Sequence, residues 1–183
     1  MNWLVLRLSV TTFTIAACFL PPALAFDDAA PFGFAWGPLE KVPKPSLALK
    51  EANITVLLYR QDRLPVDEMP DTEFVLLDVC RKEGLQQISW ASKALSANEA
   101  AAKFAQVVAR GVQRYGESKV TPEGALAWQD GRIEALSVSE PDGKHRLLMV
   151  HRGPGFGPCS AEHDLTSDQA LRNRWLQRPE ISN

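Results

Sequence analysis

Three residues near the end of the sequence are of types that bind metals or act as nucleophiles. His151, Cys159 and His163 lie in one short stretch, and Cys159 and His163 would share a face if that stretch were helical. Imidazole and thiolate are the ligands that zinc and copper prefer. The three residues therefore form a candidate metal site, and they support a small exported metal-binding protein or enzyme as an alternative function.

The cysteines also allow a competing interpretation, in which two of them form a disulfide. Of the three cysteines, Cys18 lies in the N-terminal segment described below, so Cys80 and Cys159 remain as a pair. An even number of cysteines in an exported chain is typical of disulfide bonding. Because the bridge would consume Cys159 and no second ligand pair is apparent, the sequence favours a Cys80–Cys159 disulfide over a metal or another cofactor.

Sequence motifs of common enzyme sites are missing. No Gly-x-Ser-x-Gly, His-Glu-x-x-His or Cys-x-x-Cys pattern occurs, and neither Cys80 nor Cys159 has a family signature for a nucleophile. The segment Gly153–Pro158 is glycine-rich, but its prolines remove backbone donors that a phosphate loop needs. We therefore assign no catalytic residues and favour a non-enzymatic protein. An enzyme whose residues meet only in three dimensions stays an alternative.

Residues 1–25 have the pattern of a bacterial export signal. An apolar run, Leu8–Leu20, follows a single arginine, and Ala23 and Ala25 supply the small residues of a cleavage site. The apolar run is shorter than the roughly 20 residues that a membrane-spanning helix needs. The sequence therefore predicts a cleaved signal peptide, and a periplasmic or secreted protein.

A lipid anchor is the alternative interpretation of the same segment. Ile15–Cys18 resembles a bacterial lipobox, in which the cysteine is lipidated and becomes the first residue. Stable attachment would need more than one acyl chain on Cys18. In that case the protein is an envelope lipoprotein on a membrane surface.

Composition excludes several classes of partner. The chain of 183 residues has a net charge of −2, and no basic stripe interleaved with aromatic residues appears. Nucleic-acid binding is therefore not expected. No second apolar segment of membrane length follows the export signal, so we expect no transmembrane segment after cleavage.

Residues 26–46 form an N-terminal arm that is rich in proline, glycine and aromatic residues. Phe32, Phe34 and Trp36 lie within it, and the aromatic content argues against a disordered leader. Such rings either pack on their own domain or stack against a ligand. We predict Phe32, Phe34 and Trp36 as partner-binding residues.

The sequence predicts one α+β domain over residues 47–165, followed by a short helix and tail over residues 166–183. The most regular helical pattern covers residues 97–115, where Ser96 and Glu99 form a capping box and Gly111 lies on the apolar stripe, allowing close approach to a sheet. β-Branched and alternating patterns predict strands at 53–60, 73–80, 85–91, 125–128, 132–139 and 144–152.

These patterns predict an antiparallel sheet, made of a hairpin and a three-stranded meander, packed against one long helix. The function that the sequence favours is an exported binding or interaction module, held together by one disulfide. Its partner, an unidentified protein or a component of the cell envelope, is not specified by any motif.

Overall fold

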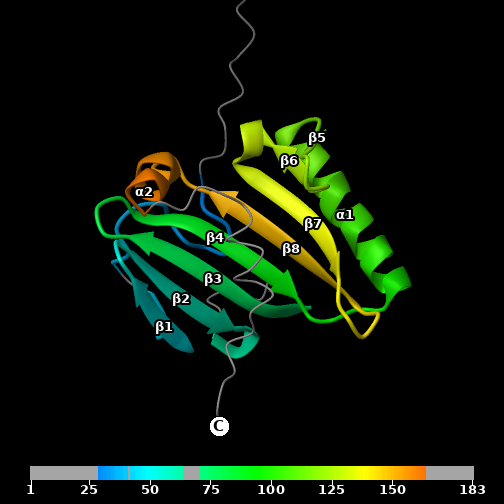
Figure 1. Ribbon diagram of the computed structural model, residues 1–183, viewed down its shortest axis with the longest axis horizontal. Coiled ribbons are helices and arrows are strands. Elements are labelled where there is room, and N and C mark those ends of the chain that lie inside the picture. The colour runs from blue at the N-terminus through cyan, green and yellow to red at the C-terminus, as the bar shows by residue number, and fades with distance from the viewer. Residues whose placement is uncertain (1–28, 41, 64–70, 164–183) are drawn as a thin grey trace, which may run out of the picture.

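The computed structural model describes residues 29–40, 42–63 and 71–163 (Figure 1). The signal peptide predicted at residues 1–25, the alternative lipidation site Cys18 and the C-terminal helix predicted within 166–183 lie outside the described residues. The interpretations of those segments therefore stay predictions.

Within these described ranges, eight antiparallel strands form one sheet in the order β1-β2-β3-β4-β8-β7-β6-β5. The strands are β1 (Leu47–Glu51), β2 (Ile54–Arg60), β3 (Thr72–Cys80), β4 (Gly84–Ser92), β5 (Lys119–Val120), β6 (Leu126–Trp128), β7 (Ile133–Ser139) and β8 (His145–Arg152). Short 3-10 turns occupy Gln61–Arg63 and Gln129–Gly131. With two α-helices, the described residues have the α+β class that the sequence predicted.

The sheet is built from two consecutive four-stranded meanders that meet at β4 and β8. These two strands pair antiparallel, with Trp90 opposite Met149 and Ile88 opposite His151. The predicted hairpin corresponds to β3 and β4, the predicted meander to β6, β7 and β8, and the strand predicted at 53–60 to β2. The sheet is wider than predicted because β1 and β5 extend its two edges. Both edge strands are short and mostly exposed, so neither has the apolar alternation by which a buried strand is recognised.

Helix α1 (Ala97–Tyr115) connects the two meanders and has the predicted bounds. The Ser96 hydroxyl accepts a hydrogen bond from the Glu99 backbone N–H, and the Ser96 N–H donates to the Glu99 carboxylate over 3.0 Å. At the other end, the Gly116 N–H donates to the Val112 carbonyl with a φ of 85° that favours glycine. The capping box and glycine thus set both ends of α1.

One face of the sheet carries the main core. Phe104, Val107 and Tyr115 of α1 pack against buried residues of β6 and β7, and Figure 1 shows α1 alongside this half of the sheet. The N-terminal arm lies over residues of β2, β3 and β4, where Phe32 is buried and Phe34 and Trp36 are partly buried against the same cluster. The predicted partner-binding rings therefore contribute to the core.

The arm approaches β4 closely at two glycines. Gly37 and Leu85 exchange both backbone hydrogen bonds, over 3.2 and 2.7 Å. A Cβ atom on Gly84 would lie 2.1 Å from Gly37. Gly84 is therefore required by the close contact of two backbones as well as by its positive φ of 72°.

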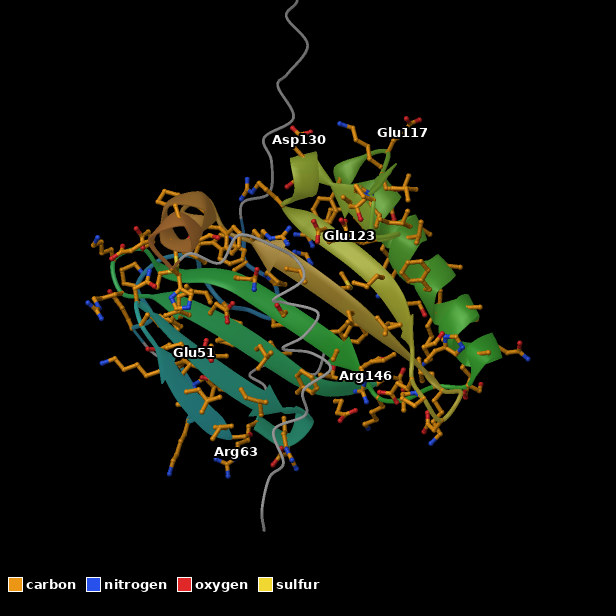
Figure 2. The ribbon with its side chains drawn as sticks, in the orientation of Figure 1. Glu51, Arg63, Glu117, Glu123, Asp130 and Arg146 are labelled. Carbon is orange, nitrogen blue, oxygen red and sulfur yellow. A yellow bond between two sulfur atoms is a disulfide. The ribbon has the colours of Figure 1, made fainter. Side chains whose placement is uncertain are left out.

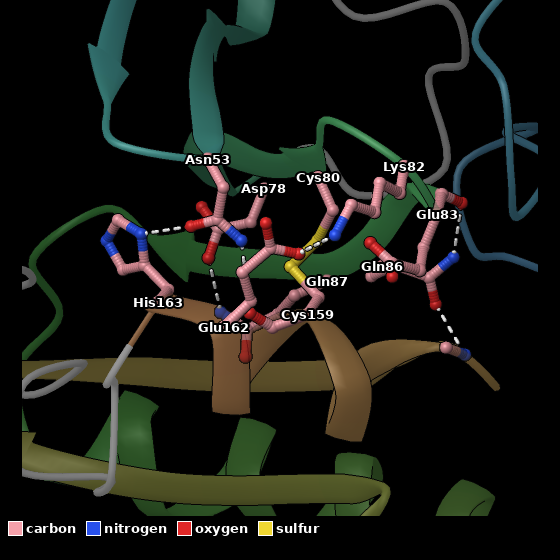
Figure 3. The surroundings of a disulfide bond; sticks show 11 residues. Asn53, Asp78, Cys80, Lys82, Glu83, Gln86, Gln87, Cys159, Glu162 and His163 are labelled. Carbon is pink, nitrogen blue, oxygen red and sulfur yellow. Dashed lines mark hydrogen bonds and ion pairs between the residues drawn. A yellow bond between two sulfur atoms is a disulfide. The ribbon is translucent and has the colours of Figure 1, made fainter.

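The Cys80–Cys159 disulfide predicted from the sequence is present on the other face of the sheet. It joins the end of β3 to helix α2 (Phe156–His163), with a Cα–Cα distance of 6.0 Å (Figure 3). Ile54 and Val56 are buried with the two cysteines, and the Asn53 side chain donates to the Cys159 carbonyl over 3.3 Å. This cluster holds α2 against β2 and β3.

The glycine-rich segment before α2 serves close packing. A Cβ on Gly153 would lie 2.7 Å from the Trp36 ring, and the Gly155 N–H donates to the Gln86 side-chain oxygen over 2.7 Å. The glycines therefore allow the backbone after β8 to pack closely against Trp36 and Gln86, and this path places Cys159 beside Cys80.

Arg146, near the start of β8, connects this strand to three neighbouring segments. Its side chain is 8% exposed; it donates to Glu140 over 3.0 Å and to the Ser92 carbonyl over 2.7 Å, and it pairs with Glu73. Figure 2 shows Arg146 beside the end of β4, away from Asp130 and Glu117 at the opposite end of the domain. A buried guanidinium needs several acceptors, and three different segments supply them here.

None of the helices within the described ranges is long and apolar enough to span a membrane.

We expect loss of the disulfide to lower stability without changing the fold. The bridge closes a loop with a sequence separation of 79 residues. On the chain-entropy model, such a loop contributes up to about 4.5 kcal/mol by restricting the unfolded chain. The double variant Cys80→Ser/Cys159→Ser should therefore unfold at a lower urea concentration than the wild-type protein. The wild-type protein unfolded in excess dithiothreitol is the control and should also show a lower midpoint, without the added cost of two buried serine hydroxyls. An unchanged midpoint in both would contradict a stabilising bridge.

Candidate functional site

A cavity of about 220 Å³ lies between α1, the sheet and the N-terminal arm. Most of its wall is apolar or aromatic, and its polar groups come from two arginines, one tyrosine, one histidine and two indoles. The lining residues are Ala29, Pro31, Phe32, Trp90, Val107, Arg110, Gly111, Arg114, Tyr115, Trp128, Ile133, Met149 and His151.

Helix α1 supplies one wall through residues that recur at helical spacing. Val107, Gly111 and Arg114 lie one turn apart along the same face of the helix, with Arg110 beside them. Gly111 is buried, and a Cβ atom at this position would lie 2.5 Å from Cζ2 of Trp128. The glycine therefore lets the indole of β6 lie directly against the helix.

Besides Trp128 of β6, the sheet supplies the opposite wall from the neighbouring strands β4, β8 and β7. Trp90 and Met149 are paired across β4 and β8, and Ile133 and His151 are paired across β7 and β8. Residues that are directly paired in an antiparallel sheet project to the same face. The antiparallel registers thus gather these four side chains under α1.

The two indoles of the wall differ in their hydrogen bonding. Trp90 Nε1 donates to Thr72 Oγ1 over 2.7 Å. Trp128 is 2% exposed, and its Nε1–H is buried without an acceptor among the described residues. A buried donor without a partner costs about 1–3 kcal/mol, so this N–H is a local cost of packing the indole against α1.

His151 is held in its neutral form. Burial, and to a smaller extent the positive charge of Arg114, together lower the pKa of this imidazole from 6.5 to about 4. The ring of Tyr115 stands edge-on to it, with 6.4 Å between ring centroids. At neutral pH the imidazole can therefore donate one hydrogen bond and accept another.

Two arginines form the charged part of the cavity wall. Arg110 and Arg114 are exposed on the last turns of α1, and the Arg114 guanidinium lies 5.5 Å from the centre of the Tyr115 ring. None of the described lining residues is an aspartate or glutamate. The cavity therefore combines aromatic walls, a neutral imidazole and a positive rim.

The structure does not bring His151, Cys159 and His163 together. His151 lies under α1 in the cavity, Cys159 is bonded to Cys80, and His163 contacts Asn53 on the other face of the sheet. Among the described residues, ligand-type atoms of Cys80, Glu83 and Cys159 do lie within 4.8 Å of one another. Both sulfurs of that group are in the disulfide, which leaves one carboxylate.

The sequence indicated only parts of this site. Phe32 was singled out, but as a partner-binding residue, and it forms part of the cavity wall. Gly111 was expected to allow close contact with a sheet, and Trp128 occupies that contact. The pair Arg110 and Arg114 was missed; its helical spacing beside the apolar stripe is the signal that could have identified it.

Comparisons of the chain with protein-family models, with curated proteins and with solved structures gave no match.

The partly buried, neutral imidazole of His151 predicts a pH-dependent stability. Between pH 6.5 and about 4 the unfolded chain binds a proton at His151 that the folded protein does not bind. The free energy of unfolding should therefore fall as the pH is lowered through this window, by up to about 3 kcal/mol from this group. Urea unfolding as a function of pH should show a shallower slope for His151→Gln. An identical slope in the wild-type and His151→Gln proteins would contradict a neutral His151.

The contact between Gly111 and Trp128 predicts that Gly111→Ala destabilises the protein. Alanine favours the helix by about 1 kcal/mol, but overpacking against a buried indole costs about 1–3 kcal/mol. We expect a net loss of stability in urea unfolding, with a changed tryptophan emission spectrum. Gln113→Ala, an exposed position on the same helix, should change stability by only a few tenths of a kcal/mol. If Gly111→Ala is as stable as Gln113→Ala, the prediction is wrong, because the Trp128 indole would then move away from the added methyl group at no cost.

Proposed function

We propose that this protein is an exported, non-enzymatic binding protein that holds a small, mainly apolar molecule in the cavity between α1 and the sheet. The export part of the proposal rests on the pattern of residues 1–25. The binding part rests on the cavity itself, and it replaces exposed arm aromatics with a partly enclosed cavity as the contact surface. Phe32 keeps a part in binding because it belongs to the cavity wall.

The aromatic cavity of about 220 Å³ is the observation that carries this proposal. An apolar cavity of roughly 150 Å³ is already large enough to hold benzene. The cavity is partly open to solvent, so a ligand can enter it, and a bound apolar molecule would remove its aromatic walls from water. Burial of that apolar surface favours binding of a mainly apolar ligand.

The polar groups of the wall support binding over catalysis. Apart from Tyr115, whose ring stands edge-on to His151, the described lining residues include no serine, threonine, cysteine, lysine or carboxylate that could act as a nucleophile or orient the His151 imidazole. The wall instead offers the imidazole of His151, which can orient a ligand by hydrogen bonds. A few polar groups in a largely apolar wall are typical of small-molecule sites.

Titration with toluene tests whether the cavity takes an apolar ring. We expect saturable shifts of the Trp128 and Trp90 indole resonances in ¹H–¹⁵N NMR spectra, and a rise in melting temperature with toluene concentration. Val107→Phe places a ring in the cavity and should abolish both effects. Its control is Val112→Phe on the same helix, where the valine is 42% exposed and outside the cavity wall, and where binding should persist.

Folding of each variant is checked by its own cooperative melting transition. If the wild-type protein shows no saturable shift, or if Val107→Phe and Val112→Phe bind toluene equally well, the cavity is not the binding site.

A further inference from the structure

We propose that the natural ligand is a small organic anion, with an apolar body of about one aromatic ring and a negatively charged headgroup held between Arg110 and Arg114. This inference rests on the proposed function and names the class of ligand that the same cavity takes. Three features of the wall carry it, namely the paired guanidinium groups, the neutral imidazole and the size of the apolar part.

The two arginines place like charges one helical turn apart. Arg110 and Arg114 both line the cavity, and like charges at this spacing destabilise a helix by a few tenths of a kcal/mol. Arg114 also lies in the last turn of α1 and over the Tyr115 ring, where a cation is favourable without a ligand. Arg110 lies before that last turn, so neither interaction accounts for its place in the wall. An anion bound between the two guanidinium groups would remove their repulsion and form charge-assisted hydrogen bonds.

The imidazole of His151 adds a donor on the sheet side of the same cavity. The charged groups in the wall are Arg110 and Arg114 from α1, while the arm, β4, β6 and β7 contribute apolar or aromatic residues. A neutral imidazole can donate its N–H to an anionic oxygen without first losing a proton. A bound anion would also offset the effect of Arg114 and raise the pKa of His151 above its value of about 4 in the free protein.

The size of the cavity limits the apolar body. Its volume of about 220 Å³ exceeds what a single benzene ring needs and leaves room for a compact headgroup. Trp90, Trp128 and Phe32 supply the flat apolar surfaces against which such a ring would pack.

Benzenesulfonate and benzenesulfonamide form the matched pair of probes for the charge. The two share one ring and sulfonyl oxygens, but only the sulfonate is ionised, and it stays ionised over the pH range in which His151 titrates. We expect benzenesulfonate to bind about tenfold more tightly than benzenesulfonamide in calorimetric titrations at low salt, with a preference that shrinks as salt is added. Arg110→Gln should weaken sulfonate binding about tenfold and leave sulfonamide binding unchanged.

Arg60→Gln is the control variant, because it removes the same charge from an exposed position on β2, outside the cavity wall. It should bind both probes as the wild-type protein does. As a second measurement, NMR titration of the His151 ring should show a higher pKa with benzenesulfonate bound than with benzenesulfonamide bound.

The failures of the two proposals are distinguishable. Equal affinity for the two probes, or an equal loss of sulfonate binding in Arg110→Gln and Arg60→Gln, would overturn the anion proposal while toluene binding keeps the cavity as a ligand site. Binding of toluene with no binding of either sulfonyl probe would also overturn it. If toluene and both probes fail to bind the wild-type protein, the proposed function itself is wrong.

Discussion

The pairing of β4 with β8 is the interaction on which the rest of the structure depends. Five residue pairs, including Trp90 with Met149, join two meanders that are separated in the chain by α1. Such a pairing closes a long loop, so its conformational entropy cost must be offset by the core that forms around it. The disulfide supports the same junction from the other face, because it ties the segment that leaves β8 to the end of β3.

The central pairing also explains why a cavity forms where it does. It places Trp90, Met149 and His151 side by side beneath α1, while the arm covers the neighbouring part of the same face. The helix reaches the sheet most closely at Gly111, where Trp128 fills the space of a missing side chain. Large rings that meet a helix and an arm from different directions leave a gap, and the wall of that gap contains an unpaired indole N–H. A site that retains such a donor departs from the usual satisfaction of buried polar groups, as functional sites often do.

Local patterns predicted the strands that alternate and the helix that carries its own caps. The region 85–91 was recognised as a strand, but its alternation indicated one polar face, whereas every residue of β4 is buried. Gln87 and Ser89 are covered because β4 lies in the middle of a wide sheet, and the Gln87 side chain donates to Asp78 over 2.8 Å. Edge strands such as β1 escaped detection for the opposite reason, since an exposed edge imposes little hydrophobic pattern. The candidate metal residues were close in sequence, yet β8 and α2 direct them to different faces of the sheet.

The sequence by itself determined the bounds of α1 and most strand segments, because capping and hydrophobic periodicity act over short distances along the chain. It also determined the cysteine pair, because an even number of cysteines in an exported chain indicates a disulfide from residue type alone. Tertiary structure alone decided which strands became central, the burial of Phe32 and the convergence of Arg110, Trp128 and His151 on one cavity. Those three residues come from α1, β6 and β8, and only strand order and register bring them within reach of one ligand. Long-range pairing is set by the total free energy of the packed core, which no local segment of the chain contains.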